Sequence, residues 1–121
     1  MKILVDADAL VAIAKINDSN HRKALEIASW HKKDILRISP DAIGEAVTVL
    51  SNKVSYQIAC DFLVNIRKSN LIELAVNKGI VSIADEVFLK QMKKHTSWFD
   101  CLNVALYRYY HMEAIFSFDL F

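Results

Sequence analysis

Glycine is scarce in this 121-residue chain, which contains only two, Gly44 and Gly79, far apart in the sequence. Walker-type phosphate loops, dinucleotide-binding loops and the nucleophile turn of α/β-hydrolases need closely spaced glycines, because the backbone there must approach a ligand or turn sharply. The sequence therefore excludes these three kinds of site.

Cysteine and long apolar runs are also scarce. The two cysteines, Cys60 and Cys101, lie in apolar helical contexts, so we expect reduced core thiols rather than a disulfide framework. The apolar run at the N-terminus, residues 3–5, is too short for a signal peptide or a membrane span. We therefore expect a cytoplasmic protein without a membrane anchor.

Apolar residues, in contrast, are plentiful. The hydrophobic fraction is 54% and the mean hydropathy is +0.20, which is enough to build a full core. Cores of this kind commonly serve about 100–200 residues, so we predict a single domain over residues 1–121. The net charge of +1 does not by itself indicate a nucleic-acid partner.

The order of apolar patterns predicts an α/β protein. Aliphatic and β-branched runs predict strands at 2–5, 35–38, 71–76 and 114–118. Helical spacing predicts helices at 10–16, 21–31, 40–50, 55–68, 98–111 and within 80–95. Strands that alternate with helices form a mainly parallel sheet covered on both faces. Its strand carboxyl ends share one edge, where such proteins bind ligands.

Acidic residues follow the first and the last predicted strands. Asp6 comes directly after the first strand, Asp8 stands two residues later, and Asp119 follows the last strand. If these strands are neighbours, the acids face one crevice. The plainer explanation is an Asp that turns the chain by bonding to nearby backbone.

Glu45 is the only charged residue between Ala42 and Leu50, in a mostly apolar helix. A Glu on such a helix usually has a specific partner. Gly44 beside it costs helix stability, and we expect it to allow another element to approach closely.

Asp100 has two open interpretations, because Ser97 and Asp100 together resemble a capping box at a helix start. As a set, however, Asp6, Glu45, Asp100 and Asp119 are hard oxygen ligands suited to Mg²⁺ or Mn²⁺. The four histidines show no spacing typical of a zinc site. No Ser/His or Cys/His arrangement indicates a side-chain nucleophile.

These acids lie in segments that together resemble the PIN-domain ribonucleases, in particular the toxin of a VapBC-type toxin–antitoxin pair. The segments are Ile3-Leu4-Val5-Asp6-Ala7-Asp8, Ile43-Gly44-Glu45-Ala46, Ser97-Trp98-Phe99-Asp100-Cys101-Leu102-Asn103-Val104-Ala105 and Ile115-Phe116-Ser117-Phe118-Asp119. They span almost the whole chain in the family's order. The sequence departs from the family pattern at Asp8, where Ser, Thr or Asn is usual, and it lacks the short segment with which family members usually continue.

The resemblance implies a three-layer α/β/α sandwich and hydrolysis of RNA phosphodiester bonds with Mg²⁺ or Mn²⁺. Asp6, Glu45, Asp100 and Asp119 would be the metal-binding catalytic acids. Asp8 and Ser117 would support them, with the Ser117 hydroxyl orienting the first Asp. The resemblance also implies a homodimer and a cognate antitoxin. Arg22, Lys93 and Lys94 are candidates to hold the RNA backbone.

Two other classes of function remain open. The first is a PIN-like module that binds RNA or protein without catalysis. The second is aspartate-based phosphoryl transfer, as in a haloacid-dehalogenase-type phosphatase or a receiver domain, with Asp6 at the start of the acidic pair. A receiver needs an acceptor Asp after a middle strand, and the strand predicted at 71–76 is followed by Asn77 and Lys78.

Overall fold

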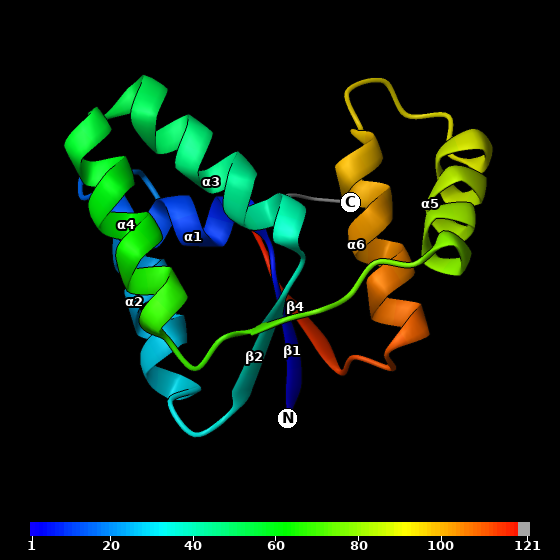
Figure 1. Cartoon of the computed structure of the whole chain (residues 1–121), viewed down its shortest axis with the longest axis horizontal. Helices are drawn as coiled ribbons and strands as arrows, with labels where there is room; N and C mark the ends of the chain where they lie inside the picture. The colour runs from blue at the N-terminus through cyan, green and yellow to red at the C-terminus, as the bar shows by residue number, and fades with distance from the viewer. Residues whose placement is uncertain (119–121) are drawn as a thin grey trace.

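The computed structural model describes residues 1–118. In chain order the elements are β1 (Lys2–Val5), α1 (Ala7–Ala14), α2 (His21–Trp30), β2 (Ile35–Ile38), α3 (Pro40–Lys53), α4 (Tyr56–Lys68), β3 (Ile72–Glu73), α5 (Lys78–Lys90), α6 (Trp98–Tyr109) and β4 (Ala114–Phe116) (Figure 1). The predicted alternation of strands and helices is confirmed. None of the helices in this part of the chain is both long and apolar enough to cross a bilayer.

The sheet is parallel, with strand order β3–β2–β1–β4. Val5 of β1 pairs in register with Ile38 of β2 on one side and with Phe116 of β4 on the other. Because the strands run in one direction, the residues after Val5, Ile38 and Phe116 emerge at the same edge, which we call the carboxyl edge. The first and last strands are therefore neighbours, as a shared crevice requires.

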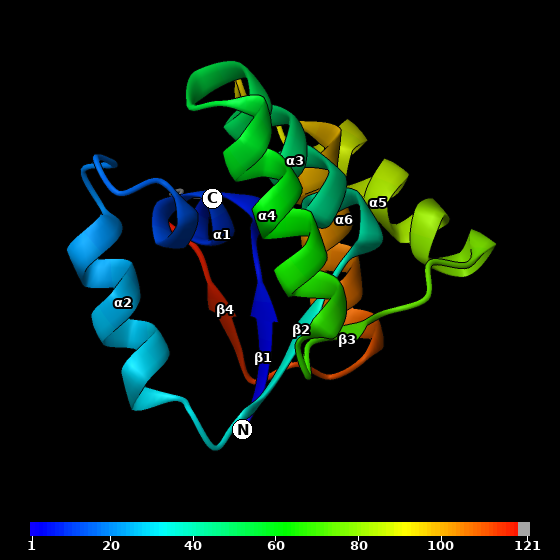
Figure 2. The ribbon, with the colours of Figure 1, turned by 60° about the vertical axis from the view of Figure 1, so that its left-hand side comes forward.

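Side-chain alternation along β1 divides the core into two layers. Ile3 and Val5 are buried in one cluster with residues of α1, α2, α3 and α4, whereas Leu4 is buried in a second cluster with residues of α5 and α6. The helices accordingly lie in two groups on either side of the strands (Figure 1), and the turned view shows α2 beside β4 (Figure 2). The predicted three-layer α/β/α fold is confirmed.

Local signals for the helix starts agree with the structure. Ser39, Ser55 and Ser97 each cap a helix by accepting a hydrogen bond from a backbone N–H of its first turn, and Pro40 takes the first helical position of α3. The expectation for Gly44 was wrong. It is exposed, and a Cβ added there would meet nothing within 4 Å, so no element uses the space beside it.

Two strands are shorter than predicted. β3 covers only Ile72–Glu73, because it lies at the sheet edge with β2 as its one partner, and the chain then leaves to begin α5. β4 ends at Phe116 because the backbone N–H of Phe118 turns to donate to Asp8 Oδ2. The prediction of longer strands failed where tertiary contacts replace strand pairing.

The strand order argues against a receiver domain. Receivers follow the doubly wound order 2-1-3-4-5, which places the first strand between the second and the third. Here β1 lies between β2 and β4, with β3 outside β2. This topology excludes the receiver alternative.

Candidate active site

Asp6 is held at the carboxyl edge by three parts of the chain. Its backbone N–H donates to Phe116 O at 3.0 Å, and its Oδ1 caps α1 by accepting from Ala7 N at 2.7 Å. Asn103 Nδ2 of α6 donates to Oδ1 at 3.0 Å, and Ser117 Oγ, just after β4, donates to Oδ2 at 3.0 Å. The carboxylate is thus fixed by donors from elements that are far apart in sequence.

Asp8 is drawn into the same group through Ser117. The Ser117 hydroxyl lies 3.0 Å from Asp6 Oδ2 and 3.4 Å from Asp8 Oδ2, so the shorter contact is with Asp6. Phe118 N donates to Asp8 Oδ2 at 2.9 Å. Because one hydroxyl contacts both carboxylates, two acids lie next to each other at the end of the central strand.

Asn103 is the site residue that the sequence reasoning did not single out. It is one of two buried polar residues among the described residues, with 8% of its surface exposed. Nearby residues of α6 are apolar, and Leu102 and Leu106 are buried in the core. A buried amide needs a hydrogen-bond partner. A polar residue in this apolar stretch was therefore the available signal.

Asp100 forms the capping box that was one of its two interpretations. Its Oδ2 accepts from Ser97 N at 3.0 Å, and its N–H donates to Ser97 Oγ at 3.1 Å. Asp100 also precedes Asn103 by three residues, so the two side chains share a face of α6. Asp100 therefore lies one turn before Asn103 on the same face of α6, and Asn103 in turn donates a hydrogen bond to Asp6.

Glu45 lies in the second turn of α3, half-buried, with Ala42 and Ala46 buried beside it. α3 begins directly after β2 at the carboxyl edge, as α1 begins after β1. α6 also begins at this edge, because it ends near the start of β4 and runs opposite to the strands. Helix N-termini carry partial positive charge, which favours carboxylates placed nearby.

The structure therefore brings Asp6, Asp8, Asn103 and Ser117 into contact, with Asp100 on the same face of α6 as Asn103 and Glu45 on α3. Within residues 1–118 no three His, Cys, Asp or Glu side chains form a group that could hold a metal ion. Asp119 lies outside the described residues. The ligand roles of Asp6, Glu45, Asp100 and Asp119 remain predictions, as do the supporting roles of Asp8 and Ser117.

The donor chemistry nevertheless fits a hard cation. The predicted ligands are all carboxylates, which suit Mg²⁺ and Mn²⁺, and the hydrogen bonds from Asn103 and Ser117 fix one of them as outer partners fix metal ligands. Cys101, the thiol next to Asp100, is fully buried, and burial raises its pKa, with the charge of Asp100 adding to the effect. This thiol therefore stays neutral and is unsuited to act as a nucleophile.

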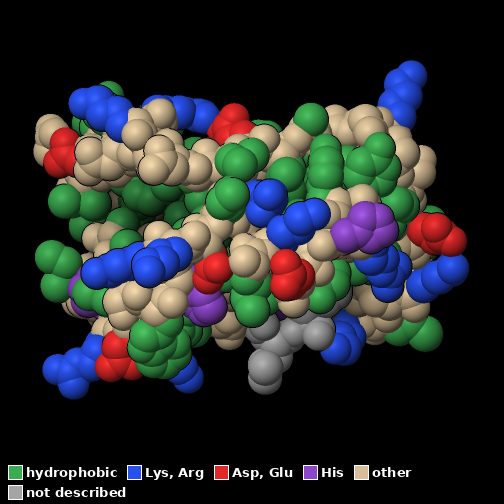
Figure 3. Space-filling model, turned by 90° about the horizontal axis from the view of Figure 1, so that it is seen from below, with side chains coloured by type: hydrophobic (Ala, Val, Ile, Leu, Met, Phe, Trp, Pro, Cys, Tyr) green, Lys and Arg blue, Asp and Glu red, His purple; other side chains and the backbone are tan. Residues whose placement is uncertain are grey.

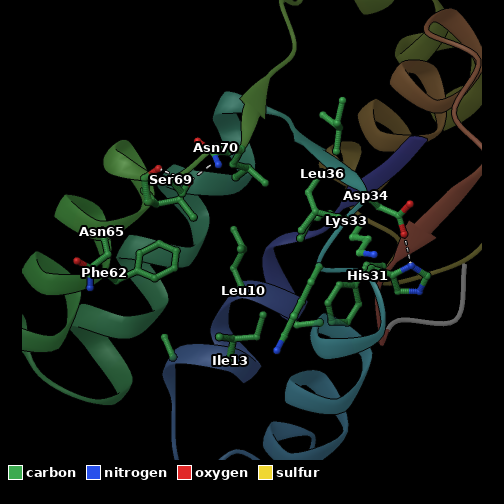
Figure 4. A pocket seen from close by; sticks show the side chains of 18 of the residues that line it. Leu10, Ile13, His31, Lys33, Asp34, Leu36, Phe62, Asn65, Ser69 and Asn70 are labelled. Atoms are coloured by element: carbon green, nitrogen blue, oxygen red, sulfur yellow. Dashed lines mark hydrogen bonds and ion pairs between the residues drawn. The ribbon is translucent and has the colours of Figure 1, made fainter. Parts of the chain in front are cut away.

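A large apolar groove lies elsewhere on the molecule, and none of Asp6, Asp8, Glu45 and Asp100 lines it. Its volume is about 760 Å³, and it opens between α1, α2, α4 and β2. Leu10, Ile13, Leu36 and Phe62 point into it (Figure 4), and the space-filling view shows a hollow lined by hydrophobic side chains (Figure 3). His31, Lys33 and Asp34 lie along its rim.

No protein-family model matches the sequence, and the curated proteins contain no significant match. Among solved structures, the chain is similar to the crystal structure of VapC20 from Mycobacterium tuberculosis, a toxin that cleaves the sarcin–ricin loop. The TM-score is 0.86 at 19% sequence identity, over 97% of this chain and 89% of that chain. The two chains therefore share a fold, which confirms the predicted PIN-like fold class.

Proposed function

We propose that this chain is an endoribonuclease that hydrolyses RNA phosphodiester bonds with Mg²⁺ or Mn²⁺. The observation that carries the proposal is the fixed carboxylate of Asp6, held by Asn103 and Ser117 at the end of the central strand. Ligand sites of open α/β sheets lie at this edge. The shared fold with a toxin that cleaves an RNA loop supports the same reaction class.

In this proposal Asp6, Glu45, Asp100 and Asp119 hold the divalent cation. Such cations supply Lewis acidity, which activates water and polarises the scissile phosphate. Asn103 and Ser117 are positioning residues, because their hydrogen bonds set the direction of the Asp6 carboxylate. Asp8 contacts Ser117 and fixes the turn after β4 through Phe118 N.

The reaction requires no covalent intermediate on the protein. Water attacks phosphorus and gives up a proton to solvent, the P–O bond to the leaving oxygen breaks, and that oxygen takes up a proton from solvent. The chain's own contribution is to place the carboxylates rigidly and to hold the phosphate backbone beside them. RNA in the cytoplasm is the proposed substrate.

We further propose that the chain is the toxin of a toxin–antitoxin pair, acts as a homodimer, and is neutralised by a small antitoxin. The apolar groove supports the idea of a protein partner, because a concave apolar surface can receive the apolar face of another chain. The groove would receive an apolar segment of the antitoxin, while the acids stay on a separate surface.

The proposed nuclease is tested by Asp6→Asn and Asn103→Ala in a cleavage assay with Mn²⁺ or Mg²⁺. Asp6→Asn should abolish cleavage and leave the fold intact. Asn103→Ala should lower the rate about 10- to 100-fold and raise the Mn²⁺ concentration needed for half-maximal rate, because the ligand loses its orientation. Full activity in Asp6→Asn would remove the proposal.

A matched pair of variants separates the two interpretations of Asp100. Asp100→Asn keeps an oxygen that can accept from Ser97 N but removes the charge. Ser97→Ala keeps the charge and removes half of the capping box, at a cost of about 1 kcal/mol in stability. A ligand role predicts that only Asp100→Asn abolishes cleavage. A role in capping alone predicts that Asp100→Asn cleaves normally.

The alternative is a PIN-like module that binds RNA or protein without catalysis. The engagement of Asp100 in its capping box favours this alternative. Isothermal titration with Mn²⁺ discriminates the two, since a nuclease should bind the ion and lose that binding in Asp6→Asn. RNA binding without Mn²⁺ binding or cleavage would support the silent module.

A further inference from the structure

The segment that joins α5 to α6 combines positive charge with exposed apolar surface. It contains Lys93 and Lys94, both exposed, and Met92, which is 97% exposed. Neither lysine forms an ion pair with any acid of residues 1–118, whereas Lys90 at the end of α5 pairs with Glu86. The segment arches over the start of α6 (Figure 1). Two lysines without an acidic partner in this part of the chain therefore precede the helix start that carries Asp100.

Phe99 follows these lysines in the chain and directly precedes Asp100. It precedes Asn103 by four residues, and Asp100 precedes Asn103 by three, so all three side chains share one face of α6. Asn103 in turn donates to Asp6. Phe99 is 43% exposed despite being aromatic. An exposed ring therefore shares a face of α6 with Asp100, a proposed ligand, and with Asn103, the partner of Asp6.

The Phe99 ring is also held in place. Trp98 packs against it edge to face, with ring centroids 5.6 Å apart and an interplanar angle of 84°. Trp98 Nε1 donates to Asp85 Oδ1 of α5 at 2.8 Å, which anchors the pair to the neighbouring helix. A rigid exposed ring loses little conformational entropy when a planar group stacks on it.

We propose that Lys93, Lys94 and Phe99, which we call the α5–α6 strip, bind unpaired nucleotides of the RNA. The lysines contact phosphates, and a splayed-out base stacks on Phe99. This inference rests on the proposed function, because it places the strip beside the acids that cut. Stacking on an aromatic ring selects single-stranded or loop RNA over duplex, whose bases are stacked on each other. The strip therefore deepens the assignment to a nuclease that acts on unpaired RNA.

The ring is tested with Phe99→Leu, which keeps an apolar contact for Trp98 but removes the stacking surface. Tyr109→Leu is the matched control, because Tyr109 is in the last turn of the same helix, 45% exposed, and also in an edge-to-face pair. Fluorescence anisotropy would follow full-length protein binding a labelled single-stranded RNA of about 12 nucleotides in EDTA. Phe99→Leu should bind about tenfold more weakly. Tyr109→Leu and Phe99→Tyr should bind like the wild type.

The lysines are tested by the salt dependence of the same binding. The double change Lys93→Ala and Lys94→Ala should reduce the slope of log K against log salt by about 1.4, at about 0.7 per phosphate contact on a single strand. Lys23→Ala with Lys53→Ala removes the same charge from two other exposed positions and should leave the slope unchanged. A duplex of the same sequence should bind weakly and be insensitive to Phe99→Leu.

Equal losses for Phe99→Leu and Tyr109→Leu, or for the two lysine pairs, would overturn the strip. The cleavage assay keeps this outcome separate from the proposed function. Wild-type cleavage together with strip variants that bind normally removes the strip and keeps the nuclease. Binding that depends on the strip, without cleavage in any divalent cation, keeps the RNA contact and removes the nuclease. Wild-type protein that binds no RNA removes both.

Discussion

The two faces of the sheet are covered by different kinds of side chain. On the α5–α6 face, aromatic residues close the surface with polar tips that find partners. Tyr110 OH donates to Ala75 O at 2.7 Å, Asn77 donates to Tyr109 OH, and Trp98 donates to Asp85. On the α1–α4 face, aliphatic side chains and Phe62 line much of an open groove of about 760 Å³.

The two faces differ in how their aromatic and apolar side chains meet water. An aromatic ring with a polar tip can cover a core on one side and meet water on the other. Leu36, Phe62 and Ile66 have no such group, so the groove they line leaves apolar surface in contact with water. We call the α5–α6 face the closed face, after these hydrogen-bonded aromatic residues, and we expect the grooved face to gain more from a partner. Substitutions on the closed face should therefore mainly lower stability, whereas substitutions in the groove should mainly weaken partner binding.

The largest expected effect is on the closed face. Leu106→Ala removes a side chain with no exposed surface and should lower the free energy of unfolding by about 3–5 kcal/mol, because a sealed cavity remains. Leu36→Ala is the matched change on the groove wall, where the side chain is only half-buried. It should cost about 1 kcal/mol, because little burial is lost. Thermal unfolding measures both losses of stability. Equal losses for Leu106→Ala and Leu36→Ala would contradict the difference between the two faces.

The next effect concerns the partner. Phe62→Ala on the groove should leave cleavage and most of the stability intact but weaken antitoxin binding about tenfold or more, since aromatic anchors dominate such interfaces. Growth rescue by a co-expressed antitoxin, together with its binding constant, measures this. Tyr109→Ala on the closed face is the control. Equal rescue of both variants would show that the groove is not the docking surface.

A smaller effect should follow from Tyr110→Phe, which deletes one hydroxyl on the closed face. The loss of its 2.7 Å hydrogen bond to Ala75 O should cost about 1 kcal/mol. Tyr107→Phe, in the last turn of α6 before Tyr110, removes a hydroxyl that lies 3.5 Å from Glu113 O, at the limit of a hydrogen bond, and should cost almost nothing. Denaturant unfolding resolves this difference. A larger loss in Tyr107→Phe would show that the polar tips do not close this face.

The comparison also shows which features were readable from the sequence. The strands Lys2–Val5 and Ile35–Ile38 and the helix starts at Ser39 and Ser97 were predicted with their bounds, because buried runs and caps are local signals. The pairing of Asn103 with Asp6 joins residues 97 positions apart, and no local pattern encodes it. The open space beside Gly44 and the groove are set by how the helices pack in three dimensions, which the local sequence does not reveal. Local chemistry therefore predicted most of the helices and strands, but not which residues of neighbouring elements contact each other.

The smallest expected effect is a pH dependence at the rim of the groove. Asp34 accepts hydrogen bonds from His31 Nδ1 at 2.6 Å and from the N-terminal ammonium at 3.0 Å. The hydrogen bond from His31, followed by that from the N-terminus, holds the pKa of Asp34 below its usual value. A lowered folded-state pKa contributes stability above the unfolded pKa of about 3.9, and that stability is lost as the pH falls through the folded pKa.

Asp34→Asn should therefore lower the melting temperature slightly at neutral pH, and the difference from wild type should vanish as the pH falls below the folded pKa. Glu86→Gln is the counterpart on the closed face, where a hydrogen bond from Lys90 lowers the pKa of Glu86. Its ion pair spans one turn of a single helix, whereas Asp34 ties the N-terminus to the loop before β2. Asp34→Asn should thus have the larger effect, because the Asp34 contact joins segments 33 residues apart, whereas the Glu86 contact lies within one helix. Equal shifts for both variants across this pH range would show that the two faces do not differ in this respect.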